Sequence, residues 1–503
     1  MLQKFAVFCS LLICAYLEFA FYPGHSFLAG STQVFVPMLE RLQEPGLLSR
    51  DLVATHPIQR YTNYDEATLF LLRVAHLPFE QALAAQQFAA RVAETIGFYL
   101  LARAAGAGIW GAILSSAFAG FGAWLPGALV STADREPVPY GFAFAYMVLS
   151  LGLFTDAKVL LCGLAGGIAL LYSPGIAVPV WLVLILGCAV VKGLRPALRP
   201  TLTTFLVFGL LLANLAQLQP GAPGAMSWWA AASWDWLRVV RERTPEALPE
   251  MWAHAFWLYL AAATAAGCAA FRLWPRLNLA TRWIFAALLL GGLLSMPVTV
   301  VAQRTRLQVF TIQTEPTRML LFTVGLAIIL CGALAGRCMK QALWREAAIW
   351  LVCAGGVAGI TFLGPPRERA ASQKEVRELA DWALRSTWGG SLFLFPHAEH
   401  GLAPGVFRAL SLRSVYVDWQ GGELTRYYSE FGIEWRRRWE EVRRARRTAN
   451  GLGELLEQPI DYFVLDDGHE LAEVRPVFRN RAYLVYDARD LRSARPALHT
   501  VSR

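Results

Sequence analysis

Two acidic residues, Asp134 and Glu136, stand two positions apart in a short polar stretch, STADREPVPY, between two apolar runs. On an extended turn, carboxylates at this spacing can converge on a divalent cation or on a hydroxyl group that must lose its proton. A solvated acidic loop would look the same, so both interpretations stay open. An earlier polar stretch adds Asp51 and the neighbouring Asp65 and Glu66. If both stretches cover one pocket, they predict a general base with an electrostatic partner, or a site for Mg²⁺ or Mn²⁺.

Arginines stand beside apolar runs in two later polar stretches. Arg318 ends QRTRLQVFTIQTEPTR, which also contains Arg306, and Arg243 lies in SWDWLRVVRERTPEALPEMW among tryptophans. An arginine at the membrane boundary can bind a phosphate or diphosphate, so we predict that Arg318, Arg243 and Arg306 bind the phosphate of a lipid-linked substrate. The alternatives are arginines that reach toward lipid headgroups and, around Arg243, an anchoring interfacial helix.

The composition is that of a membrane protein with many spans. Of the 503 residues, 56% are hydrophobic and 17% are charged, and the mean hydropathy is +0.40. The 18 Trp and 15 Tyr suit two interfacial belts. All eight cysteines lie within or beside apolar runs, which excludes a disulfide framework and a cysteine-based metal site.

Apolar runs predict about eleven transmembrane helices, the first of them retained rather than cleaved as a signal peptide. The predicted spans are Phe5–Tyr22, Phe88–Arg103, Ile109–Leu125, Tyr140–Phe154, Val159–Tyr172, Ile176–Val191, Leu202–Leu218, Trp252–Phe271, Trp283–Ala302, Met319–Gly336 and Ala347–Leu363. The closely spaced third to sixth runs leave ten or twelve spans open as alternatives.

Lys and Arg collect in every second connection, which predicts a cytoplasmic N-terminus and an outer C-terminal tail. Residues 25–87 then form a long outer loop. Its amphipathic stripes and ionisable groups indicate a structured working surface. The net charge of +9 follows from this topology and an Arg-rich tail, so it does not call for a nucleic-acid partner.

The tail changes character, which divides the chain into a membrane domain (1–365) and an outer domain (366–503). Helical patterns at Glu375–Ser386 and Glu434–Arg447 alternate with short strands at 391–395, 414–419, 461–465 and 482–486, which predicts a small α/β domain. The tail has no phosphate loop, nucleophile elbow or HExxH motif. Four residues could serve as ligands, although acidic residues at strand ends are more often ordinary loop residues: Asp418, Asp466, Asp467 and His469.

The long first outer loop, the acidic second loop, the many spans and the outer α/β tail together resemble the GT-C superfamily of integral membrane glycosyltransferases. More narrowly, the chain resembles a bacterial family of uncharacterised multispan proteins. The matching stretches are VPMLERLQEPGLLSRD, EPVPY followed by LCGLAGGIALLYSP, RERTPEALPEMW, QTEPTRMLLF, and FRALSLRSVYVDWQGG with EWRRRW.

The resemblance implies a bacterial inner membrane, with the outer C-terminal domain in the periplasm. It also implies sugar transfer from a polyprenyl-phosphate donor to an acceptor on the outer face of that membrane. A first-loop carboxylate would act as base, and a second carboxylate would hold a metal or position the acceptor. By position, the second carboxylate is Glu136, with Asp134 beside it, and the outer arginine is Arg318. GT-C enzymes commonly have an acidic residue just after the first span, where this chain reads HSFLAGSTQ, with Asp51 as the nearest substitute that matches a motif.

Three functions are therefore open. The first is a glycosyltransferase whose partners are a lipid-linked sugar, membrane lipids and an envelope acceptor. The second is a non-catalytic scaffold of the same shape that binds a protein or an envelope polymer. The third is a transporter or lipid flippase, which would need ionisable residues deep within its spans or paired broken helices in two repeats. No repeat is evident, and the span interiors contain few polar residues, among them Glu94, Asn214 and His254.

Overall fold

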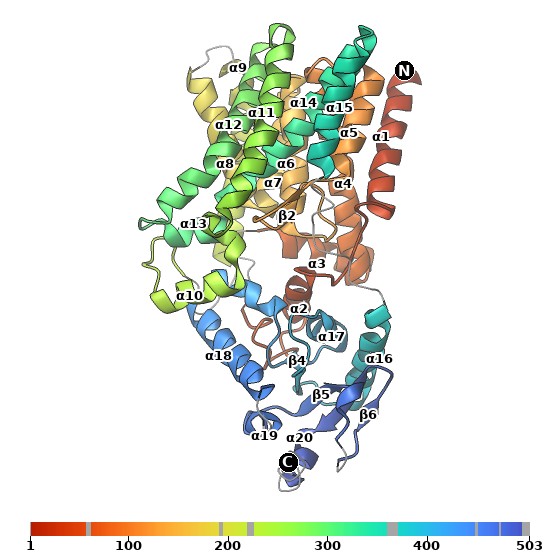
Figure 1. The fold of residues 1–503 in the computed structure, drawn as a ribbon, viewed down its shortest axis with the longest axis vertical. Helices are drawn as coiled ribbons and strands as arrows, with labels where there is room; N and C mark the ends of the chain where they lie inside the picture. Colours follow the sequence, from red (N-terminus) through yellow and green to blue (C-terminus); the bar gives the residue numbers. More distant parts are fainter. Residues whose placement is uncertain are drawn as a thin grey trace.

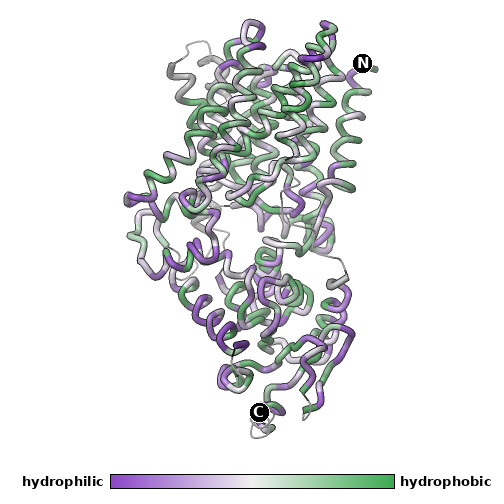
Figure 2. The backbone as a smooth tube through the Cα atoms, in the orientation of Figure 1, coloured by the Kyte–Doolittle hydropathy of each residue, from purple (hydrophilic) through white to green (hydrophobic). Residues whose placement is uncertain are grey.

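The computed structural model describes residues 2–56, 62–190, 195–218, 226–359, 371–447, 451–471 and 474–494. The helices of the first three quarters form a bundle at one end, and the tail lies at the other (Figure 1). The N-terminus lies at the far end of the bundle from the tail. Hydrophobic residues dominate the bundle, whereas hydrophilic residues are much more frequent in the tail (Figure 2). The boundary predicted at 365/366 lies outside the described residues.

A helix lies at each of the eleven predicted span positions. These helices are α1 (Leu2–Ala20), α4 (Phe79–Ala104), α5 (Ile109–Gly120), α6 (Pro139–Thr155), α7 (Val159–Tyr172), α8 (Pro174–Val190), α9 (Arg195–Leu218), α11 (Phe256–Leu273), α12 (Leu279–Ala302), α14 (Leu320–Lys340) and α15 (Trp344–Gly359). Among the described residues, four helical segments are long and apolar enough to cross a membrane: Leu2–Ala20, Pro249–Arg276, Leu279–Ala302 and Pro316–Lys340. The chain thus has the helices of a membrane protein, and the count of about eleven spans stays a prediction.

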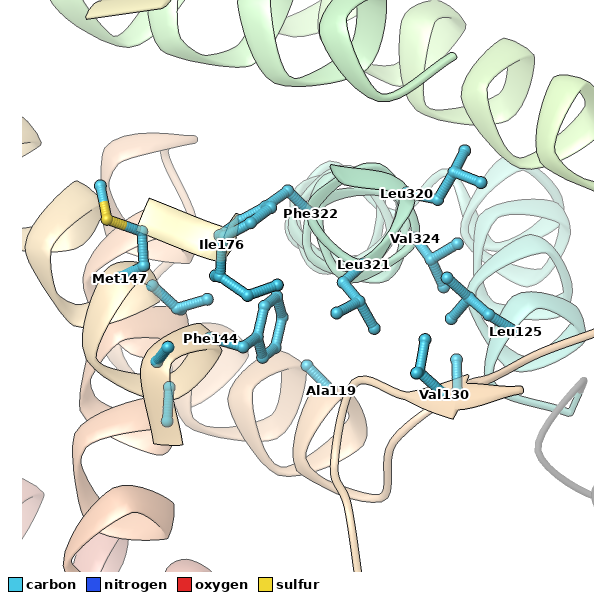
Figure 3. Packing of buried hydrophobic residues seen from close by; sticks show 14 of the residues in the cluster. Ala119, Leu125, Val130, Phe144, Met147, Ile176, Leu320, Leu321, Phe322 and Val324 are labelled. Atoms are coloured by element: carbon cyan, nitrogen blue, oxygen red, sulfur yellow. The ribbon is translucent and has the colours of Figure 1, made fainter. Parts of the chain in front are cut away.

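Helix α14 is the centre of the bundle. In its most apolar window 89% of the residues are buried inside the protein, against 17% for α1, so α14 packs against protein and α1 is peripheral. Figure 3 shows Leu320, Leu321, Phe322 and Val324 of α14 among apolar side chains of its neighbours. The phenyl rings of Phe322 and Phe144 lie 4.9 Å apart. This packing fixes the start of α14 and therefore the residues just before it.

The polar stretches between the spans are also structured. The first outer loop contains α2 (Thr32–Gln43) and α3 (Tyr64–Ala75), and α4 begins nine residues before the predicted span, at Phe79. The second forms a two-stranded hairpin, β1 (Trp124–Leu125) with β2 (Val130–Ser131). Later come α10 (Trp234–Arg243), the 3₁₀ turns η2 (Pro245–Ala247) and η3 (Pro249–Ala255), α13 (Gln308–Thr314) and η5 (Pro316–Met319).

The tail contains a five-stranded sheet in the order β4-β3-β5-β7-β6, and its predicted strands lie where they were expected. Strand β3 (Leu392–Leu394) runs parallel to β4 (Ser414–Val415) and to β5 (Tyr462–Asp466). Strands β7 (Tyr483–Asp487) and β6 (Phe478–Arg479) complete it antiparallel. The tail helices are α16 (Ala371–Ser386), α17 (Ala403–Ser411), α18 (Ser429–Ala445), α19 (Gly451–Leu455) and α20 (Ala488–Ser493), with the 3₁₀ segments η7 (Gln420–Arg426) and η8 (Asp467–His469).

The first outer loop packs on the tail rather than standing free. Val34, Met38 and Val53 belong to one hydrophobic cluster with residues of β3, β5 and α18. In Figure 1, α2 lies between the helix bundle and the tail. Burial of this shared apolar surface stabilises the position of the tail against the loop. The first outer loop, which carries Asp51, is thereby fixed between the helix bundle and the tail.

Candidate functional site

A cavity of about 460 Å³ lies where the bundle meets the tail. Its wall combines the start of α8, the end of α13 with η5, the residues before α10, and the residues that join η7 to α18. Aromatic and apolar side chains dominate one part of the wall, and the charged residues are Glu315 and Arg318. The lining residues include Pro174, Trp228, Trp229, Glu315, Arg318 and Tyr427. Such a volume, mostly apolar with few charges, suits an amphipathic ligand.

Arg318 lies at the wall of this cavity, in the turn that leads into α14. Its side chain is 15% exposed and pairs with Glu315 three residues earlier. Its guanidinium lies over the ring of Tyr140, 4.3 Å from the centroid. A guanidinium has five N–H donors. Among the contacts of the described residues, Glu315 is the one acceptor for the Arg318 side chain, so donors remain for a ligand.

Glu315 connects this arginine to the tail. Its other carboxylate oxygen lies 2.6 Å from Nη1 of Arg426. The Nη2 atom of Arg426 pairs with Glu246 at 3.0 Å. Glu315 adopts a left-handed conformation with φ +45°, which is uncommon for a residue other than glycine. The two ion pairs and the following Pro316 hold that conformation. The chain of charges therefore fixes the cavity wall against the tail.

Tyr140 also contacts Asp134, so one side chain links the carboxylate to Arg318. The Tyr140 hydroxyl donates to Asp134 Oδ2 at 2.5 Å, and the Glu136 N–H donates to Oδ1 at 3.2 Å. Desolvation raises the pKa of Asp134, while the Tyr140 hydrogen bond and the positive charges of Arg91 and Arg318 lower it. The structure thus brings together two residues that the sequence separates by almost two hundred positions.

Glu136 is bound into the start of the first outer loop. Its Oε1 accepts hydrogen bonds from the N–H groups of Ala29 and Gly30, both at 2.8 Å, and from the Thr32 hydroxyl. Its Oε2 accepts from the N–H of Thr32 at 3.3 Å, in the first turn of α2. A carboxylate at a helix N-terminus is favourable. Desolvation nevertheless raises the pKa of Glu136 to about 7, and the donor from Thr32 opposes that shift.

Glu136→Gln should make stability less dependent on pH. A folded-state pKa raised from 4.5 to about 7 means that the folded protein holds a proton that the unfolded chain releases, so the contribution of Glu136 to stability falls as the pH rises through that window. Glutamine cannot ionise and removes this part of the slope. We expect the apparent unfolding temperature, followed by tryptophan fluorescence, to fall less between about pH 5 and pH 8 in the variant than in the wild type.

The replacement also adds an offset at every pH, because the amide of Gln points a donor at a backbone N–H and leaves a buried group unpaired, at a cost of about 1–3 kcal/mol. Glu44→Gln is the matched control, since Glu44 is an exposed carboxylate of the same loop. An unchanged pH slope in Glu136→Gln would contradict the assignment.

Behind Asp134 lies a buried polar cluster that the sequence analysis missed in part. Arg91 and Glu94 of α4 form an ion pair at 3.2 Å with side chains 3% exposed, and Arg91 also donates to the backbone carbonyl of Asp134. Glu18, 2% exposed, accepts from the Thr95 hydroxyl at 3.1 Å. Glu18 is therefore an acidic residue in the last turn of the first helix. The sequence did contain a sign of this, because a single carboxylate inside an apolar run indicates either a functional residue or a buried polar partner.

Asp51 lies in a different environment. Both of its oxygens are engaged: Oδ1 accepts from the N–H groups of Val53 and Ala54, and Oδ2 accepts from the N–H of Val415 at 2.9 Å. The fully buried Arg408 lies 3.8 Å from Oδ2. None of the contacts described for Asp51 includes Asp134, Glu136 or Arg318. The structure therefore does not bring Asp51 into one site with the second-loop carboxylates. Asp51 instead joins the first loop to the tail.

The two other predicted arginines also lie apart from Arg318. Arg243 is buried, donates from Nε to the Trp419 carbonyl at 2.6 Å, and stacks on the Trp419 ring at 4.6 Å. Desolvation lowers the pKa of Arg243, and Glu246 opposes this. These contacts attach α10 to the tail. Arg306 is exposed between α12 and α13, and its role in phosphate binding stays a prediction.

A divalent cation does not fit Glu136 as the structure places it. The two carboxylate oxygens are surrounded by N–H and O–H donors, whose positive ends would repel Mg²⁺ or Mn²⁺. In the described part of the chain, one group of three side chains has ligand atoms close enough to share a metal ion, and it lies in the tail: His397, Asp466 and His469. No step proposed below uses a metal at Glu136.

Several solved structures are similar to this chain. They include the oligosaccharyltransferase of Archaeoglobus fulgidus in complex with Zn and sulfate (12% identity, TM-score 0.46, covering 92% of this chain and 68% of that one). They also include ArnT from Cupriavidus metallidurans bound to undecaprenyl phosphate (13% identity, TM-score 0.40, covering 97% of this chain and 98% of that one). A third is the arabinofuranosyltransferase AftD from Mycobacteria (17% identity, TM-score 0.47, covering 93% of this chain and 35% of that one).

These solved structures are GT-C glycosyltransferases, the superfamily that the sequence resembles. No family model and no curated protein matches the chain.

Proposed function

We propose that the protein transfers a sugar from a polyprenyl-phosphate donor to an acceptor at the tail side of the helix bundle, which the predicted topology places on the outer face of a bacterial inner membrane. The observation that carries the proposal is that Arg318, in the wall of an amphipathic cavity, lies over the ring of Tyr140, whose hydroxyl binds Asp134. A cation for the leaving phosphate and a base for the nucleophile are the two groups that such a transfer needs.

In the proposed step, an acceptor hydroxyl oxygen attacks the anomeric carbon of the donor. The bond between that carbon and the phosphate oxygen breaks, and its electron pair leaves with the polyprenyl phosphate. Arg318 stabilises the negative charge of that phosphate through its remaining N–H donors. The hydroxyl proton moves to Asp134, whose raised pKa suits a base better than that of an exposed aspartate.

The surroundings of Arg318 suit a lipid phosphate in particular. Trp228, 39% exposed, and Trp229, 67% exposed, lie in the cavity wall and offer an apolar surface to a polyprenyl chain. Arg318 precedes α14, a helix of 21 residues, whose N-terminal dipole favours a bound anion.

Arg318→Ala should lose polyprenyl-phosphate binding by about 10- to 100-fold, because a charge-assisted hydrogen bond contributes about 1.5–3 kcal/mol. Native mass spectrometry of the protein purified in mild detergent, with and without added polyprenyl phosphate, measures the bound lipid. Glu315 keeps its pair with Arg426 in the variant, so the cavity wall should remain in place.

Arg304→Ala is the matched control, because Arg304 is exposed in the same polar stretch. Arg318→Lys should retain part of the affinity, since a point charge remains while the bidentate geometry is lost. If the wild type takes up no polyprenyl phosphate, or if Arg318→Ala binds it as well as the wild type does, the transferase proposal fails.

A second function is favoured by a different observation. Both oxygens of Glu136 and both of Asp51 are bound by structural donors, which is what a non-catalytic scaffold would show. Such a scaffold would bind a protein or an envelope polymer through the tail. It would carry no bound lipid phosphate, so the Arg318 experiment separates the two functions.

A further inference from the structure

The order of strands in the tail creates a place where ligands commonly bind. From β3 the chain passes through α17 to β4 on one side, and it then returns through α18 and α19 to β5 on the other side of β3. From the carboxyl end of β3 the chain thus turns toward β4, whereas from the carboxyl end of β5 it turns the opposite way, toward β7 and β6. In open α/β sheets the crevice at such a reversal, beyond the carboxyl ends of the parallel strands, is the usual ligand site.

Three ligand-type side chains stand at that reversal. His397 follows β3 by three residues, Asp466 is the last residue of β5, and His469 ends η8 directly after it. One donor atom from each lies within 4.8 Å of the other two. The rings of His397 and His469 are stacked with their centroids 3.9 Å apart. The sequence analysis singled out Asp466 and His469, and the fold adds His397 from a distant segment.

Among the described residues, the ligand atoms of this group lack the ion pairs that the neighbouring carboxylates make. Asp467 and Glu470 are both paired with Arg479, at 3.1 Å and 2.8 Å. Within the described residues, Asp466 has no hydrogen bond or ion pair through its carboxylate. The Nδ1 atom of His397 is shielded from solvent and has no hydrogen-bond partner there either. A buried imidazole nitrogen without a partner is costly unless something binds it.

We propose that His397, Asp466 and His469 bind a divalent transition metal of the zinc class. Two imidazoles and one carboxylate are the ligand set that Zn²⁺ takes in sites that keep a fourth position open. Mg²⁺ and Ca²⁺ prefer oxygen ligands and should bind poorly. The metal would join the loop after β3 to the end of β5 across the reversal, and its open position would face a ligand.

A second cavity of about 300 Å³ adjoins the loop that carries His397. Pro396, Ala398 and His400 of that loop line it, together with Trp419 and Trp439. A metal at His397 would therefore order one wall of a cavity with an aromatic side. This arrangement does not involve Arg318 or Asp134, so it stands or fails separately from the proposed transfer.

The test uses the full chain, purified in detergent with a tag that contains no histidine and stripped of metal with a chelator. Zn²⁺ binding is measured by competition with a chromogenic chelator. We expect one equivalent of Zn²⁺ to bind at this site. His469→Ala and Asp466→Asn should each lower the Zn²⁺ affinity by at least about 10- to 100-fold, because the loss of a group that only supports a metal ligand already has that effect. Because His469 and Asp466 are exposed, their replacement should leave the fold intact.

His400→Ala and Asp467→Asn are the controls, a histidine and an aspartate next to the site that should keep full Zn²⁺ affinity. Bound Co²⁺ should give visible absorption bands in the wild type and lose them in His397→Ala, which reports the imidazole ligand directly. An excess of Mg²⁺ should not compete. The proposal is overturned if the wild type binds no equivalent of Zn²⁺, or if His397→Ala/His469→Ala binds the same equivalent with unchanged affinity.

Discussion

Arg408→Met is expected to destabilise the protein by about 3–5 kcal/mol, the usual cost of removing one partner from a buried ion pair. Arg408 is fully buried in α17, with Nη1 2.6 Å from Asp418 Oδ1 and 3.8 Å from Asp51 Oδ2. Its Nη2 donates to the carbonyl of Gln33 at 3.0 Å. Methionine fills most of the space and leaves two carboxylates without a cation. Denaturant unfolding followed by tryptophan fluorescence measures the loss.

Two further variants make this result specific. Arg437→Met removes an exposed arginine from ion pairs with Glu434 and Glu441, and it should cost less than about 1 kcal/mol. Adding Asp418→Asn to Arg408→Met should recover part of the stability, because one uncompensated charge disappears. Wild-type stability in Arg408→Met would mean that the loop and the tail are held by apolar packing alone.

The same cluster shows why the role of Asp51 could not be read from the sequence. A carboxylate in an outer loop of a membrane protein can act in catalysis or hold structure, and the difference lies in its partners. Beside its local hydrogen bonds, it contacts two distant groups, the N–H of Val415, 364 residues later, and the guanidinium of Arg408. Nothing in the spacing of LLSRDLV indicates these contacts, because they exist only once the tail has folded against the loop.

What the sequence did predict follows from local patterns. Apolar runs placed a helix at every expected span, and alternation placed the main strands of the tail, because both signals depend on neighbours in the chain. Glu18 was missed because one carboxylate barely changes the hydropathy of a helix of 19 residues. Arg318 lies, as expected from the sequence, directly before an apolar helix, α14. Its contact with Tyr140, and through it with Asp134, depends on how α6 and α14 pack.

Asp134→Asn is expected to lower the rate of sugar transfer by about 10²–10⁴-fold while polyprenyl-phosphate binding stays near the wild-type level, because a positioned general base contributes that much and Arg318 is untouched. Asparagine has the same shape, and its oxygen can still accept from the Tyr140 hydroxyl. The carboxylate of Asp134 is the form that accepts a proton, so the wild-type rate should rise with pH as this group, whose pKa is raised by desolvation, ionises. The variant should lose that rise. Single-turnover assays with a panel of polyprenyl-phosphate sugars measure both quantities.

Tyr140→Phe separates the base from its support. It removes the hydrogen bond to Asp134 and keeps the ring under Arg318, so it should reduce the rate less than Asp134→Asn does and leave lipid binding intact. Because the Tyr140 hydrogen bond lowers the pKa of Asp134, its loss should also move the rise in rate to higher pH. An Asp134→Asn protein that binds lipid and transfers sugar at the wild-type rate would remove Asp134 from the chemistry. The remaining buried carboxylates near Asp134 would then be Glu94, which is paired with Arg91, and Glu18.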